Sequence, residues 1–227
     1  MVTDVAGERA RRERVRDRAL AAASELFYED GIASVGMDAV RDRAGVGLKG
    51  IYREFGSKAG LVSAYLDRRD EQWMTWLEAS LGEVGDDPRQ RVLWLFDALD
   101  AWFTRPGFAG CAFVNAYGET AGGGPVADRA AQHKDRLAAL VGDLATAVDA
   151  VRAPQLQEEL MLLIEGAIVR ASVGRRHEAA RIARTIAVLL VGDPASAPSR
   201  TNPAAAVRRA ANERRQPPRR GGDVTTP

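Results

Sequence analysis

The chain has 227 residues, of which 46% are hydrophobic and 28% charged, and its formal net charge is +1; this composition is typical of a globular protein. Its single cysteine excludes an internal disulfide and a zinc site built from several cysteines. No stretch approaches the roughly 18 apolar residues of a membrane span, and charged residues stand where a signal peptide has its apolar core, so we expect a cytoplasmic protein with no membrane partner.

The amino-terminal residues 1–13 are polar and rich in arginine, and we expect a flexible basic arm there. Such an arm is either solvated or touches DNA phosphates and the minor groove. From Arg14 to Tyr28 apolar residues recur at helical spacing, and Gly31 follows as a stop signal. We therefore predict the first helix of an amino-terminal domain that covers residues 14–65.

Two short helices joined by a glycine turn come next. The first runs from Met37 to Ala44, Gly45 permits the positive φ of a tight turn, and the second runs from Leu48 to Phe55. The second helix turns apolar residues inward and basic and aromatic residues outward, which indicates a helix-turn-helix motif. The candidate DNA-binding residues are Arg41, Gly47, Leu48, Lys49, Gly50, Tyr52, Arg53 and Lys58.

These candidates have different expected roles on a duplex. Lys49 opens the second helix and can donate to guanine O6 and N7 in the major groove, so we assign it base contact. Tyr52, Arg53 and Lys58 are assigned to phosphates, which position a protein without reading sequence. Gly50 costs about 1 kcal/mol relative to alanine inside a helix, and close approach to DNA would explain its presence.

The region from Leu20 to Leu66 resembles the amino-terminal domain of TetR-type bacterial transcriptional regulators. The residues that carry the resemblance are Ala22, Leu26-Phe27, Gly31, Met37-Asp38, Val40, Ala44-Gly45-Val46, Ile51-Tyr52, Phe55, Ser57-Lys58 and Leu61. The resemblance implies a homodimer, a near-palindromic double-stranded DNA operator as partner, a small-molecule effector and no cofactor. It also implies a helical regulatory domain for ligand binding and dimerisation, here residues 66–192.

Several positions depart from the usual pattern of that family. Gly36 stands where serine or threonine commonly opens the first helix of the motif, and Ala59 replaces a frequent glutamate. Arg41 replaces a small residue, although its stem can lie along the apolar seam while the guanidinium reaches solvent. The helical scaffold of the family can therefore be transferred to this sequence, whereas the family's base-reading contacts cannot.

Helical periodicity continues through the rest of the chain, so we predict an all-α fold. Long helices are expected from Ser57 to about Leu81, from Arg89 to Thr104 and from Val126 to about Val151. The uncharged stretch from Pro106 to Gly118 is expected to be buried. Part of it, Gly110 to Ala116, also resembles a string in the regulatory domains of some TetR-type proteins.

Aromatic residues gather between Trp73 and Tyr117, where they either form ordinary core or line a cavity for an apolar or aromatic effector. Glu165 lies among apolar neighbours, so it is either paired, for example with Arg170, or turned toward a cavity. Cys111 is either a redox-sensitive thiol or an inert core residue. The candidate ligand-binding residues are Trp73, Trp102, Phe103, Phe108, Cys111, Phe113, Tyr117 and Glu165.

Two final apolar helices and a polar tail complete the chain. The stripes within Leu156–Ala171 and Ala179–Leu190 are either core of a monomer or, as is usual in TetR-type proteins, the faces that pair with a second subunit. Alanines along them allow close approach of helices. Residues 193–227 are rich in proline, alanine and arginine without a lasting apolar period, and we expect this segment to be disordered.

No catalytic or metal-binding constellation is visible in the sequence. His133 and His177 are far apart, and we expect both to be exposed. The glycines at 45, 47 and 50 have the spacing of a dinucleotide fingerprint, but that motif requires a preceding strand and none is predicted.

Three functions remain open on these grounds. The first is a dimeric DNA-binding repressor released by a small molecule. The second is a regulator of the same fold that is ligand-independent or controlled by a protein partner, which an empty, well-packed core would favour. The third is an enzyme, which would need a convergent acid, base or nucleophile in a pocket.

Overall fold

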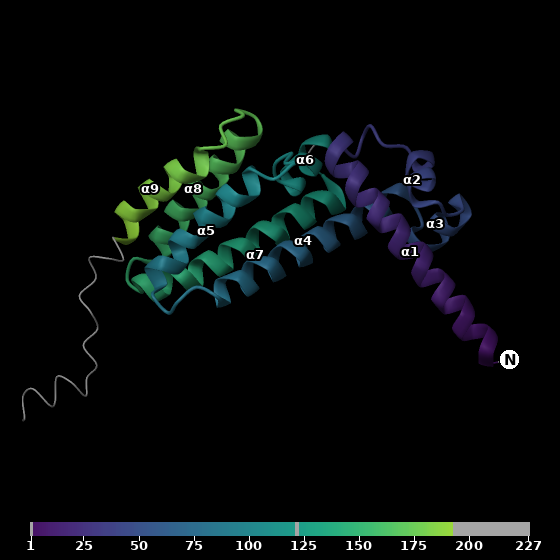
Figure 1. Cartoon of the computed structure of the whole chain (residues 1–227), viewed down its shortest axis with the longest axis horizontal. Coiled ribbons are helices and arrows are strands. Elements are labelled where there is room, and N and C mark those ends of the chain that lie inside the picture. Colours follow the sequence, from purple (N-terminus) through teal and green to yellow (C-terminus); the bar gives the residue numbers. More distant parts are fainter. Residues whose placement is uncertain (1, 121–122, 193–227) are drawn as a thin grey trace, which may run out of the picture. The chain divides into compact units, whose positions relative to one another are not determined.

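The computed structural model describes residues 2–120 and 123–192. Within these residues there are nine helices and no strand, which confirms the predicted all-α fold (Figure 1). The predicted disordered tail, residues 193–227, lies outside the described residues. The helices are α1 (Val2–Asp30), α2 (Met37–Ala44), α3 (Leu48–Phe55), α4 (Lys58–Gly82), α5 (Pro88–Phe103), α6 (Ala112–Glu119), α7 (Gly124–Val148), α8 (Ala153–Ser172) and α9 (Ala179–Val191).

Helices α1, α2 and α3 form the predicted helix-turn-helix unit, since α1 packs against both shorter helices. Val40 of α2 and Ile51 of α3 are completely buried. Gly45 ends α2 with φ of 60°, the left-handed conformation for which a glycine was expected. The turn is therefore built as the sequence predicts, and it fixes which side of α3 faces solvent.

The expected flexible arm is instead the beginning of a long helix. Helix α1 starts at Val2 and runs without interruption through residues 2–13. Arg9 pairs with Glu13 one turn later at 3.0 Å, and the Arg12 guanidinium donates to the nearly buried Glu54 of α3 at 2.7 Å. The spacing of apolar residues did not predict this part of the helix, because the segment has no apolar face and is stabilised by ion pairs instead. The hydrogen bond from Arg12 lowers the pKa of Glu54 below its ordinary value.

Helix α4 connects the helix-turn-helix unit to the remaining helices. It begins directly after Ser57, whose Oγ accepts a hydrogen bond from the Gly60 amide at 3.1 Å and caps the helix. It packs along α7, which contacts α5 and α8, while α9 packs against α5 and α8 (Figure 1). Because α4 continues without a break through residue 65, the predicted domain boundary there stays a prediction.

The uncharged stretch after α5 is only partly buried. It contains a turn and the short helix α6, which turns Phe113 inward but leaves Val114 and Tyr117 exposed. The Tyr28 hydroxyl of α1 accepts from the Ala109 amide at 3.1 Å and donates to the Gly110 carbonyl at 3.0 Å. The uncharged sequence therefore forms a junction that touches α1, as well as part of the core.

Gly50 faces α1, contrary to its expected position against DNA. A Cβ atom at Gly50 would lie 3.3 Å from Val15 Cγ1, so glycine allows α1 and α3 to pack closely. We expect Gly50→Leu to overpack this contact and to lower the free energy of unfolding by about 1–3 kcal/mol. Urea denaturation of the variant would test this, with Gly36→Leu as control because a Cβ there has open space. Equal stability of Gly50→Leu and wild type would contradict the packing role.

Candidate DNA-binding surface and ligand cavity

The exposed face of α3 carries the residues expected to touch DNA. Lys49 and Tyr52 are exposed on either side of the buried Ile51, and Tyr52 keeps 42% of its surface accessible. Arg53 is also exposed, but it lies 3.4 Å from Glu8 of α1. The structure thus leaves Lys49 and Tyr52 as the side chains of α3 most available to a partner, while the charge of Arg53 is partly offset.

The other candidate DNA-binding residues lie at the start of α3 or on the neighbouring helices α2 and α4. Arg41 is half-buried and pairs with both Asp38 and Asp42 of its own helix, so it adds little positive charge. Gly47 is exposed, and its carbonyl accepts from the Ile51 amide at 3.2 Å at the start of α3. Leu48 and Lys58 are half-buried.

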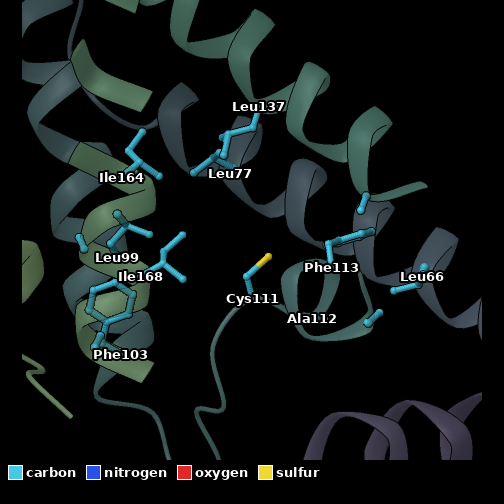
Figure 2. Packing of buried hydrophobic residues seen from close by; sticks show 14 of the residues in the cluster. Leu66, Leu77, Leu99, Phe103, Cys111, Ala112, Phe113, Leu137, Ile164 and Ile168 are labelled. Atoms are coloured by element: carbon cyan, nitrogen blue, oxygen red, sulfur yellow. The ribbon is translucent and has the colours of Figure 1, made fainter. Parts of the chain in front are cut away.

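A cavity of about 250 Å³ lies between helices α4, α5, α6, α7 and α8. Apolar side chains from separate helices, among them Leu77, Leu99 and Ile168, point toward one another around Cys111 (Figure 2). Its polar lining consists of three cationic side chains, one glutamine and one histidine. The lining residues are Arg69, Gln72, Trp73, Trp76, Leu77, Leu95, Ala98, Leu99, Trp102, Arg105, Cys111, Ala112, Phe113, His133, Lys134, Leu137, Ile164 and Ile168.

Four of the eight expected ligand-binding residues border this cavity, namely Trp73, Trp102, Cys111 and Phe113. Phe103 and Phe108 were expected there but pack beside Trp102, at ring-centroid distances of 5.7 and 5.0 Å, and do not line it.

Tyr117 was also expected at the cavity, but it lies on the outer side of α6 and is 49% exposed. Helical phase explains the difference: Phe113 and Ala116 are buried, so the residue after Ala116 points away from the core.

Glu165 does not line the cavity and does not pair with Arg170. It accepts a hydrogen bond from Lys134 of α7 at 2.6 Å, and Lys134 is a lining residue. The Lys134 ammonium also lies 3.8 Å from the buried Cys111 thiol. Sequence proximity favoured a partner on the same helix, whereas packing of α7 against α8 supplied this one.

His133 is buried, although the sequence suggested an exposed position. Its ring stacks on Phe113 with centroids 3.8 Å apart and planes at 7°, and its Nδ1 lies 2.7 Å from Asp70 Oδ1 on α4. Burial lowers the pKa of His133 below its ordinary value of 6.5, and this outweighs the opposing effect of the hydrogen bond to Asp70, which raises the pKa. The neutral ring therefore donates through Nδ1 and keeps Nε2 as an acceptor. His177 is exposed, as expected.

The lowered pKa of His133 predicts a loss of stability in mild acid. Between the folded-state pKa and about 6.5, the unfolded chain binds a proton that the folded chain excludes. The free energy of unfolding should therefore fall as pH drops below about 6.5, by at most about 1.4 kcal/mol per pH unit from this residue. Urea denaturation between neutral and mildly acidic pH would measure this slope. We expect His133→Gln to flatten it and His177→Gln to leave it unchanged; equal slopes in all three proteins would contradict the assignment.

Several lining residues were missed by sequence reasoning because they carry no apolar signal. Arg69 and Arg105 are charged, yet each stacks on an aromatic ring: Arg69 on Tyr28 at 4.2 Å and Arg105 on Trp76 at 5.4 Å. The sequence did contain one signal that could have placed Arg69 at the cavity: it lies one turn before Trp73 and therefore on the same side of α4.

Other kinds of site find no support in the part of the chain that the structure describes. No group of three or more histidine, cysteine, aspartate or glutamate side chains there is arranged to hold a metal ion. None of the described helices is long and apolar enough to cross a membrane.

A family model described as bacterial regulatory proteins of the tetR family matches residues 19–65. The chain is 37% identical over 97 residues to the HTH-type transcriptional activator FasR of Mycolicibacterium smegmatis, in a match covering 43% of this chain and 42% of that protein. The chain therefore spans less than half the length of that curated relative.

Solved structures extend the similarity beyond the amino-terminal region. A TetR-family transcriptional regulator from Streptomyces coelicolor superposes with a TM-score of 0.73 at 26% identity, covering 80% of this chain and 97% of that one. A regulator from Saccharomonospora viridis in complex with choline has the same fold, with a TM-score of 0.66 at 18% identity, covering 79% and 96% of the two chains. The family model and the helix-turn-helix geometry thus identify residues 19–65 as a DNA-binding domain of the TetR family of bacterial regulatory proteins, and the described helices as a whole have the fold of TetR-family transcriptional regulators.

Proposed function

We propose that the protein is a dimeric, sequence-specific repressor that leaves its operator when a small apolar or aromatic molecule binds in the cavity. In this proposal residues 14–65 bind DNA and residues 66–192 bind the effector and the second subunit. The protein acts in the cytoplasm and is not an enzyme.

The exposed face of α3 supports the DNA-binding part of the proposal. One α3 helix per subunit enters the major groove of a near-palindromic operator. Lys49 lies in the first turn of that helix, from which recognition helices reach base edges, and contacts a base. Tyr52 and Lys58 hold phosphates on either side.

The dimer part rests on the exposed half of the predicted α9 stripe, which includes Ile186 and Leu189, and on a face of α8 that differs from the predicted α8 stripe. Most of the α8 stripe, including Leu156 and Leu160, is buried within the single chain and unavailable to a partner. The outer faces of α8 and α9 nevertheless carry large apolar side chains that are exposed to solvent in the single chain. The exposed Gly166 lies between two of these side chains on α8 and would permit close approach of a helix from the second subunit. These residues, the outer apolar face, are Leu162, Val169, Val173, Ile182, Ile186 and Leu189.

The observation that carries effector control is the placement of α4. This helix borders the cavity through Trp73 and Trp76 and begins three residues after α3 ends. A second connection runs through the turn before α6, where Tyr28 of α1 bonds to Ala109 and Gly110 immediately before the lining residue Cys111. A ligand that prefers one arrangement of these walls therefore changes the spacing of the two α3 helices.

Reciprocal binding measurements test the proposal. A footprint on DNA upstream of the gene, repeated with candidate ligands, identifies the operator and the effector. Calorimetry with and without operator then measures their coupling. A coupling of about 100-fold corresponds to roughly 2.7 kcal/mol, and operator DNA must weaken ligand binding by the same factor. A ligand that binds equally well with and without operator is not the effector.

Activation of transcription is the second candidate, because the relative FasR is named an activator. The same DNA-binding geometry serves both outcomes, and the position of the operator relative to the promoter decides between them. A reporter fused to the bound promoter distinguishes the two: deletion of the gene raises expression under a repressor and lowers it under an activator.

The cavity of about 250 Å³ favours a regulator controlled by an effector rather than one that is independent of any ligand.

A further inference from the structure

We propose that the effector is an apolar acid: a small molecule with an aromatic or aliphatic body and one anionic group bound by Arg69, Arg105 and Lys134. This inference rests on the proposed function and specifies the chemistry of its ligand.

The charged groups that line the cavity all have one sign. Arg69 of α4, Arg105 beyond the end of α5 and Lys134 of α7 line it, and no carboxylate does so among the described residues. The other polar lining groups, Gln72 and His133, are neutral at pH 7, since burial lowers the pKa of His133. Glu165 partly offsets the charge of Lys134, but a cationic ligand would still meet the two arginines, whereas an anion would be attracted by them.

The carboxylates near the cavity already have partners within the protein. Glu165 pairs with Lys134, and Asp70 pairs with both His133 and Arg136. Arg69 and Arg105 take part in no ion pair with the described residues; aromatic rings hold them instead. A guanidinium stacked on a ring keeps its edge donors available, and this edge binds carboxylates and phosphates in bidentate fashion. The two arginines are therefore the principal anion-binding groups, and Lys134 assists them.

The remaining wall suits an apolar body. Trp73 lies between Trp76 and Trp102, with ring centroids 5.1 and 4.7 Å away, and aliphatic side chains of α4, α5 and α8 complete the wall. A volume of about 250 Å³ is slightly below the usual range of about 300–1,000 Å³ for ligand pockets. The body is accordingly small, of the size of one aromatic ring with a short chain.

Three probes of similar shape test which sign of ligand charge the cavity prefers: phenylbutyrate, its primary amide and phenylpropyltrimethylammonium. Their dissociation constants are measured on the free protein by quenching of tryptophan fluorescence and by calorimetry. We expect phenylbutyrate to bind at least about tenfold more tightly than the amide, the gain typical of one hydrogen bond to a charged group. The ammonium probe should bind most weakly of the three.

The double variant Arg69→Gln/Arg105→Gln should weaken phenylbutyrate binding by about tenfold or more and leave amide binding unchanged. Arg68→Gln is the matched control, because Arg68 precedes Arg69 on α4 and does not line the cavity. If the double variant fails to fold, as judged by circular dichroism, the wild-type comparison of the three probes decides alone.

Equal affinity for acid and amide, preference for the ammonium probe, or no binding of phenylbutyrate at about 1 mM would each overturn the inference. Failure of the proposed function is a separate result. It appears as absence of operator binding, or as binding of any cavity ligand without effect on DNA affinity, and neither result depends on the sign of the ligand's charge.

Discussion

Replacing Leu189 with aspartate is expected to convert the dimer into a folded monomer. In the single chain Leu189 is 81% exposed, so aspartate is solvated there and changes monomer stability by no more than about 0.5 kcal/mol. In the proposed dimer the same carboxylate is buried without a partner, which costs about 3–5 kcal/mol. The dimer dissociation constant should therefore rise by a factor of roughly a hundred or more.

Light scattering and analytical ultracentrifugation at micromolar concentration would measure this shift, with circular dichroism to verify the fold. Val151→Asp is the matched control, because Val151 is 92% exposed in the turn between α7 and α8, away from the outer apolar face. We expect that variant to remain dimeric. A monomeric wild type, or a dimer unaffected by Leu189→Asp, would remove the outer apolar face as the interface.

Replacing Lys49 with alanine is expected to reduce operator affinity by about 1–3 kcal/mol, or roughly 5- to 150-fold, and to relax specificity at one base pair. Lys49 is exposed in the first turn of α3, where an ammonium group reaches the guanine edge in the major groove. Fluorescence anisotropy with operator and with a scrambled duplex of equal length would separate specific from non-specific affinity.

Lys58→Ala provides the contrast, since Lys58 begins α4 and is expected at a phosphate. It should weaken binding to operator and scrambled DNA alike and reduce the slope of log affinity against log salt by about 1. If Lys49→Ala also weakens both duplexes equally, its assignment to base reading is wrong.

Local patterns were sufficient to predict the helix-turn-helix unit. The positive φ at Gly45, the cap at Ser57 and the burial of Val40 and Ile51 depend on interactions within a few residues or on helical periodicity. The sequence was likewise sufficient for the all-α fold and for part of the cavity wall, because Trp73 and Trp102 lie among apolar residues at helical spacing.

Contacts between distant helices decided the remaining features. The sequence does not specify which helix lies opposite Gly50 or which carboxylate meets Lys134, because Val15 and Glu165 are distant in the chain. The same holds for His133, whose burial depends on Phe113 and Asp70 from two other helices.

The amino-acid sequence by itself thus determined most of the helices, the family resemblance and the side chains on the exposed face of α3, although it did not predict the first turns of α1 or the short helix α6. The tertiary structure decided which apolar stripe is core, which charges meet at the cavity and which polar groups lose water. The physical reason is that helix formation and capping are local, whereas desolvation and ion pairing depend on side chains brought together only by packing. The cationic lining by Arg69 and Lys134 therefore emerges only when α4 packs along α7.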